Sequence, residues 1–270
     1  MARNSRLPKS RSSKSRPAKM GRKWTQDDVL AYKIKVVYQD LTTFFGVTDL
    51  PPPDVESDAL TAQDCHTATD DWTNFMLFHM DRLMDPDDVT GTLSNRKPAT
   101  IDFVRELFNV LHYPSVPQRR FLIARPKLDY LASQGSPPQV DVCIRDDTTA
   151  ILLVVKVYSH LRRSDPEPRL ISDAIAAFHN DNIMRVKRFG TDPLTSKVMP
   201  GIVMDGTMPT FYKIPITPEL VTAVESGKRP EEETIVHAYR PEVPRPEEGM
   251  KPLDNRFIIL SCFEAFRQFM

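Results

Sequence analysis

Glycine, cysteine and long apolar runs are all scarce in this chain of 270 residues. The nine glycines form neither GxGxxG nor GxxxxGK[ST], which argues against a Rossmann or P-loop nucleotide site. The three cysteines include no CxxC pair, so we expect neither a disulfide framework nor a zinc site. The longest apolar run, residues 150–155, is much shorter than the roughly 18 residues that span a bilayer. We therefore expect no membrane partner.

Charge is unevenly distributed along the chain. The 36 basic and 36 acidic residues give a formal net charge of zero, but residues 1–23 contain nine lysines or arginines and no acid. This Ser- and Pro-rich segment has too little apolar surface to fold, so we predict a disordered basic arm. Such an arm is typical of a nuclear localisation signal or of a contact with DNA or RNA. A tail that only improves solubility, in a cytoplasmic protein, is the alternative. The arm residues that we assign to nucleic-acid binding are Arg11, Lys14, Arg16, Lys19, Arg22 and Lys23.

The spacing of apolar residues predicts helices on both sides of a block of strands. We expect helices over 25–45, 72–84 and 100–111, the first and third capped by Thr25 and Thr100. The expected strands and helices after these are strands 121–131, 140–144 and 150–158, helix 169–188, a hairpin of strands 198–203 and 209–216, helix 220–226, strand 234–239 and helix 255–270.

This order predicts an α/β domain, bordering on α+β, in which a mixed sheet is flanked by helices. We divide the chain into the basic arm (1–23), a helical N-terminal region packed on the core (24–98), and a core that ends in a C-terminal helix (99–270).

Two residues in the strand block have the placement that phosphodiester chemistry needs. Asp141 begins one expected strand, and Lys156 stands near the end of the next. Two carboxylates on neighbouring strands can hold Mg²⁺, which polarises a phosphate and activates water. A lysine on the same face stabilises the developing charge. The simpler alternatives are that Asp141 hydrogen-bonds a turn and that Lys156 extends to solvent.

The element order and this placement resemble the PD-(D/E)XK restriction-endonuclease-like superfamily, and more narrowly a group of fungal proteins with that core. The resemblance runs from about residue 100 to the C-terminus. It implies a restriction-endonuclease-like core with Asp141 as a metal ligand and Lys156 as a catalytic residue. The segments that carry it are 140–144, 150–161, 166–178 (PEPRLISDAIAAF), 199–217 (MPGIVMDGTMPTFYKIPIT) and 253–269 (LDNRFIILSCFEAFRQF).

The chain departs from the family pattern at the second carboxylate. If the (D/E)xK register ends at Ser159, Val157 occupies the acid position; if it ends at Lys156, Val154 does. A valine cannot ligate a metal. Glu106 and Asp173, on the helices before and after the strands, are candidates for a relocated acid.

We therefore expect a catalytically impaired nuclease-like protein that binds nucleic acid or a protein partner and needs no cofactor. One alternative is an active Mg²⁺-dependent phosphodiesterase centred on Asp141. A second alternative, from another class, is an adaptor protein with no role in nucleic-acid binding.

Overall fold

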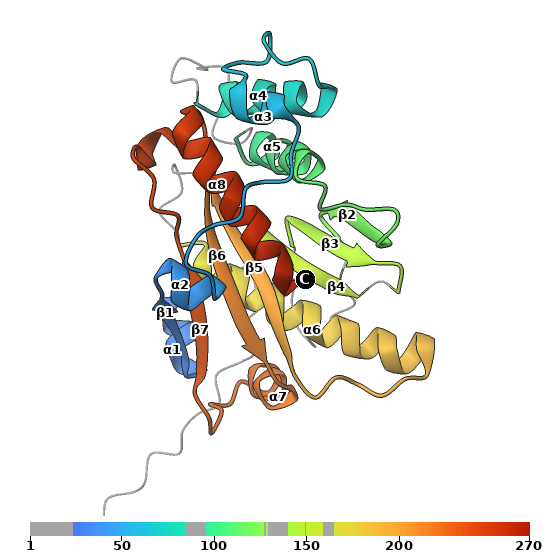
Figure 1. Ribbon diagram of the computed structural model, residues 1–270. Coiled ribbons are helices and arrows are strands. Elements are labelled where there is room, and N and C mark those ends of the chain that lie inside the picture. Colours follow the sequence, from blue (N-terminus) through green and yellow to red (C-terminus); the bar gives the residue numbers. More distant parts are fainter. Residues whose placement is uncertain (1–23, 85–95, 127, 129–139, 149, 159–164) are drawn as a thin grey trace, which may run out of the picture.

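The computed structural model describes residues 24–84, 96–126, 128, 140–148, 150–158 and 165–270. These residues form a seven-stranded mixed sheet with helices on both faces (Figure 1), so the α/β class is confirmed. The predicted basic arm, including all six residues assigned to nucleic-acid binding, lies outside the described residues.

The strand order across the sheet is β1-β7-β6-β5-β4-β3-β2. β1 pairs in parallel with β7, and β4 with β5, while the other neighbouring pairs are antiparallel. The strands are β1 (Ile34–Tyr38), β2 (Arg120–Ala124), β3 (Val142–Asp146), β4 (Ile151–Tyr158), β5 (Lys197–Asp205), β6 (Met208–Ile216) and β7 (Thr234–Tyr239).

The core consists of two apolar clusters, one on each face of the sheet, and each cluster is covered by its own set of helices. Residues of α2, α3, α4, α5 and α8 belong to one cluster, and residues of α1, α6 and α7 belong to the other. Figure 1 shows α8 and α6 on opposite faces. The helices are α1 (Gln26–Ala31), α2 (Leu41–Phe45), α3 (Ser57–Thr61), α4 (Asp71–Met84), α5 (Arg96–Val110), α6 (Glu167–Phe189), α7 (Pro218–Ser226) and α8 (Leu253–Phe266), with short 3₁₀ turns at Pro246–Glu248 and Arg267–Phe269.

The centre of the chain follows the order α5, β2, β3, β4, α6, β5. β3 and β4 form a hairpin whose ends are joined by the backbone hydrogen bond from Asp146 to Ala150, 3.0 Å long. α6 then carries the chain over one face to β5, which lies parallel to β4. Successive β4 side chains point to opposite faces, so Val154 belongs to the α6-side cluster and Val155 to the α8-side cluster. The strand block and the following helix therefore lie close to where the sequence predicts them, except that the strand predicted over 121–131 ends at Ala124, where Arg125 takes a left-handed conformation (φ 49°).

The single helix predicted over residues 25–45 is wrong. The chain forms α1, then β1, then α2, and Lys33 takes a left-handed backbone conformation (φ 51°) between the first two. Apolar residues at helical spacing coincide here with a strand that is stabilised by pairing with β7, about 200 residues later. The N-terminal region expected to be helical thus contributes an edge strand to the sheet.

The start of α5 also differs from the prediction. The helix begins at Arg96, and Thr100 is buried inside it and does not cap its first turn. Pro98 is compatible with this because the amide groups of the first helical turn need no partner within the helix.

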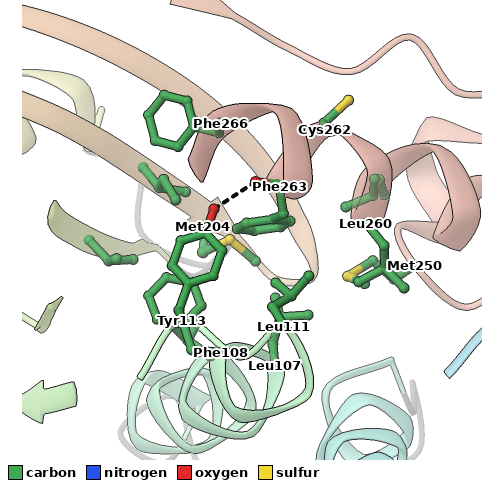
Figure 2. Packing of buried hydrophobic residues seen from close by; sticks show 14 of the residues in the cluster. Leu107, Phe108, Leu111, Tyr113, Met204, Met250, Leu260, Cys262, Phe263 and Phe266 are labelled. Carbon is green, nitrogen blue, oxygen red and sulfur yellow. Dashed lines mark hydrogen bonds between the residues drawn. The ribbon is translucent and has the colours of Figure 1, made fainter. Parts of the chain in front are cut away.

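Aromatic side chains pack together where α5 and the chain after it meet α8 (Figure 2). Phe108 and Tyr113 stack with ring centroids 4.8 Å apart, and Phe263 meets both rings edge to face. The Tyr113 hydroxyl donates a 2.7 Å hydrogen bond to the backbone carbonyl of Phe263. This contact ties the helix before the strand block to the C-terminal helix. None of the helices in the described ranges has the length and apolar character needed to cross a membrane.

Candidate functional site

The β3–β4 pairing brings Asp141 and Lys156 together. Val142 pairs with Val155 in the antiparallel register, which places the preceding Asp141 beside the following Lys156. The Val157 amide donates a 3.1 Å hydrogen bond to Oδ2 of Asp141, so the carboxylate is fixed to the backbone of β4. The sequence prediction that these two residues share one site agrees with this geometry.

Two further charged side chains complete a four-residue group that we call the Asp141 cluster: Lys97, Asp141, Lys156 and Asp173. The Lys156 ammonium lies 2.8 Å from Oδ2 of Asp173 and 3.7 Å from Oδ2 of Asp141. Lys97 of α5 lies 2.6 Å from the other oxygen, Oδ1, of Asp141. Two carboxylates and two ammonium groups therefore neutralise one another.

The Asp141 cluster is almost closed to solvent. Asp141, Asp173 and Lys156 are 1%, 2% and 6% exposed, whereas the Lys97 side chain is 43% exposed. Lys97 is thus the member of the cluster that faces water. Lys156 does not extend to solvent, and Asp141 makes ion pairs as well as the backbone hydrogen bond expected of a strand-end residue.

Burial and charge act against each other within the cluster. Burial raises the pKa of Asp173 to about 6, although the nearby Lys156 ammonium opposes this shift. Burial alone would lower the pKa of Lys156, but the carboxylates of Asp173 and Asp141 reverse that effect, and the pKa lies above its ordinary value. Lys156 therefore remains charged at neutral pH and holds a positive charge between the two carboxylates.

The alternation of β4 side chains decides between the two motif registers. Lys156 and Val154 share the face that α6 covers, and Asp173 projects from α6 to the same face. Val157 belongs to the apolar cluster on the opposite face. The motif register that ends at Lys156 is therefore the one whose lysine lies beside Asp141. In this register, Val154 stands at the position where the family pattern has an acid. Ser159 lies outside the described residues.

The relocated acid that reaches the cluster is Asp173, and Glu106 does not share this position. Glu106 accepts a 3.0 Å hydrogen bond from Asn109 on its own helix, and its charge acts on His79 of α4. Asp173 stands within the buried stretch of α6 between Ser172 and Ala174. An acid beside the apolar residues Ile171 and Ala174 of this helix was the sequence signal for it.

This donor set does not match a Mg²⁺ site. Mg²⁺ requires near-octahedral oxygen coordination, and its protein ligands are usually carboxylates. Asp141 and Asp173 are both paired with ammonium groups, and Val154 supplies no oxygen. No group of three or more His, Cys, Asp or Glu side chains suited to a metal occurs among the residues that the structure describes.

A second buried ion pair lies at the other end of the same sheet face. Asp181 of α6 is 2% exposed and lies 3.2 Å from the Lys197 ammonium. Its two carboxylate oxygens accept hydrogen bonds from the Ile151 amide, 3.0 and 3.1 Å long. It joins α6 to β4 and β5. Its contacts are those of a structural residue.

Comparison with known proteins adds no family assignment. No model of a known protein family matches the chain. The curated proteins contain no match to it either.

Proposed function

We propose that the chain is a nuclease-like protein that binds nucleic acid without hydrolysing it. The order α5, β2, β3, β4, α6, β5 supports a PD-(D/E)XK-like core, because Asp141 and Lys156 occupy the positions that this pattern gives to its first acid and its lysine. The proposed absence of hydrolysis is supported by one observation: the Lys156 ammonium lies between the carboxylates of Asp141 and Asp173.

Hydrolysis of a phosphodiester in such a core needs a dication held by free carboxylates. A dication at Asp141 would have to displace Lys97 from one oxygen and would face the Lys156 charge at the other. Repulsion between cations in a site of low dielectric constant makes this exchange costly. The proposed protein therefore keeps the fold and uses lysine charges where a hydrolytic relative would use a metal.

Nucleic-acid binding is assigned to the basic arm. The arm concentrates positive charge, whereas residues 24–270 carry an excess of acid that repels a polyanion over most of the surface. Each phosphate neutralised by a lysine or arginine releases condensed counterions, so the affinity should fall steeply with salt. A nuclear location belongs to the same proposal, with the cytoplasm as the alternative.

The first test is a cleavage assay with single- and double-stranded DNA and RNA, with Mg²⁺ or Mn²⁺. The wild-type chain is compared with Asp141→Asn and, as a matched control, Asp192→Asn, which removes the charge of an exposed acid after α6. The proposal expects no metal-dependent cleavage by any of the three. Cleavage that Asp141→Asn abolishes and Asp192→Asn retains would overturn the proposal and establish a Mg²⁺-dependent nuclease.

The second test measures binding of a fluorescent oligonucleotide as a function of salt. We expect a linear log–log dependence for the wild-type chain and a shallower one when the six arm residues are changed to glutamine. The slope should decrease by roughly 0.7–0.9 for each phosphate that the altered arm no longer neutralises. An unchanged slope would remove the arm from the interface. Absence of any salt-dependent binding would favour the adaptor alternative.

A further inference from the structure

A cavity of about 300 Å³ opens at the carboxyl ends of β4 and β5. Tyr158, the last residue of β4, and Asp205, the last residue of β5, line it together with Asp165 and Glu167 at the start of α6. Val203, which pairs with Lys156 across the two strands, forms part of its wall. The cavity therefore adjoins the Asp141 cluster and shares none of its residues. Ligands in open α/β sheets commonly bind at this end of parallel strands.

Glu167 is held in the cavity wall by neutral donors. Its carboxylate accepts hydrogen bonds from the hydroxyls of Tyr212 and Tyr38, at 3.1 and 3.4 Å, and from Nε2 of Gln26, at 3.2 Å. The residue is only 8% exposed. An ionised carboxylate offers about four acceptor positions, so three donors leave capacity for one more. The geometry fixes the carboxylate and leaves room for a charged partner.

Among the described lining residues, acidic side chains outnumber basic ones. Asp165, Glu167 and Asp205 line the cavity, and Arg240 is the one basic side chain among its described lining residues. Burial, together with the nearby charge of Asp165, raises the pKa of Glu167. A bound cation would offset both effects on Glu167, whereas an anion would be repelled by the carboxylates of Asp165 and Glu167. The three tyrosines in the lining suit an organic cation, since aromatic rings attract ammonium groups.

We propose that this cavity binds an alkylammonium group, with Glu167 as the principal counter-ion and Tyr38, Tyr158 and Tyr212 as the aromatic part of the wall. A volume at the lower end of the usual range for ligand pockets fits a small cation. The inference goes beyond the proposed function and does not depend on whether the Asp141 cluster hydrolyses phosphodiesters.

Isothermal titration calorimetry on the full chain tests the site with n-butylammonium chloride as the probe and n-butanol as its uncharged counterpart. We expect n-butylammonium to bind and n-butanol to bind at least tenfold more weakly, since n-butanol cannot form a charged hydrogen bond. Glu167→Gln should weaken n-butylammonium binding by about tenfold or more for the same reason. The control Glu56→Gln, at an exposed acid before α3, should leave the affinity unchanged.

The site would be overturned by equal binding of the charged and uncharged probes, or by an affinity that Glu167→Gln does not change. No detectable binding at millimolar probe would overturn it as well. If Glu167→Gln does not fold, Asp165→Asn replaces it in the test. Asp165 is exposed and lies before the helix, so its substitution should leave the fold intact. It should weaken n-butylammonium binding by about threefold, as expected for an exposed charge, and leave n-butanol unaffected. None of these readouts depends on cleavage, so this inference and the proposed function can fail separately.

Discussion

The Lys156 ammonium lies closer to Asp173, on a helix, than to Asp141, just before the neighbouring strand: 2.8 Å against 3.7 Å. Lys156 therefore connects α6 to the β3–β4 hairpin through charge, in a region that is otherwise apolar. Removal of either partner would leave a buried charge that is only partly compensated.

Asp173→Ala should lower the free energy of unfolding by about 3 kcal/mol at neutral pH, because it breaks a buried ion pair from one side. The double change Lys156→Met with Asp173→Leu should recover most of this loss, since no buried charge then remains at this pair. Urea unfolding of Lys156→Met, of Asp173→Leu and of the double variant measures the coupling. Additive losses would contradict the pairing.

The pH dependence of the free energy of unfolding should reveal the titration of Asp173. Its pKa is raised from an ordinary 3.8 to about 6, so the folded chain binds a proton that the unfolded chain has already released between these values. Stability contributed by this group is therefore highest below pH 4 and falls as the pH rises to about 6. The total change is of order 3 kcal/mol. To isolate this contribution, the unfolding free energies of the wild-type chain and of Asp173→Asn are measured from pH 4 to 7 and subtracted. A difference that does not change with pH would contradict a raised pKa of Asp173.

Asp181→Asn should lower the free energy of unfolding by about 2 kcal/mol. The substitution replaces one carboxylate oxygen by an amide nitrogen, in a part of α6 far from the Asp141 cluster. The amide side chain loses the ion pair with Lys197 and weakens the hydrogen bonds with the Ile151 amide. Asp192→Asn, an exposed acid just beyond the same helix, is the matched control and should change stability by less than about 0.5 kcal/mol. Thermal unfolding compares the two, and equal melting temperatures would show that the buried pair contributes nothing.

Tyr113→Phe should lower the unfolding free energy by about 1–2 kcal/mol. The hydroxyl is fully buried, and its loss leaves the Phe263 carbonyl without this donor (Figure 2). The ring contacts with Phe108 and Phe263 remain, so the fold should be unchanged by circular dichroism. A loss above about 3 kcal/mol would mean that the ring itself moves, as after removal of a core side chain.

The sequence predicted the strand block and α6 because each signal there was local. β4 begins with five consecutive aliphatic residues, the β3–β4 turn is rich in Asp and Thr, and α6 has apolar residues at helical spacing. Local signals fix element type well when the element is long and strongly patterned. They also placed Asp141 and Lys156 in one site, since the hairpin register follows from the turn.

The sequence did not predict β1 or the position of Asp173. β1 is a strand of five residues whose partner, β7, is distant in the chain, so the pairing that stabilises it leaves no local pattern. Asp173 was one of two candidate acids, and the choice between them depends on how α5 and α6 rotate against the sheet. Helix rotation is set by side-chain packing, which spacing along one helix does not encode.

The parallel pairing of β1 with β7 also determines how the chain can be divided. A shortened protein that began at residue 99 would retain every residue of the superfamily resemblance but would expose the edge of β7, whose backbone now pairs with Ile34–Tyr38. An uncovered strand edge promotes association with other chains. Insertions, fusions and cleavage sites are therefore best kept outside residues 24–45, because this short segment supplies the strand that covers the edge of β7.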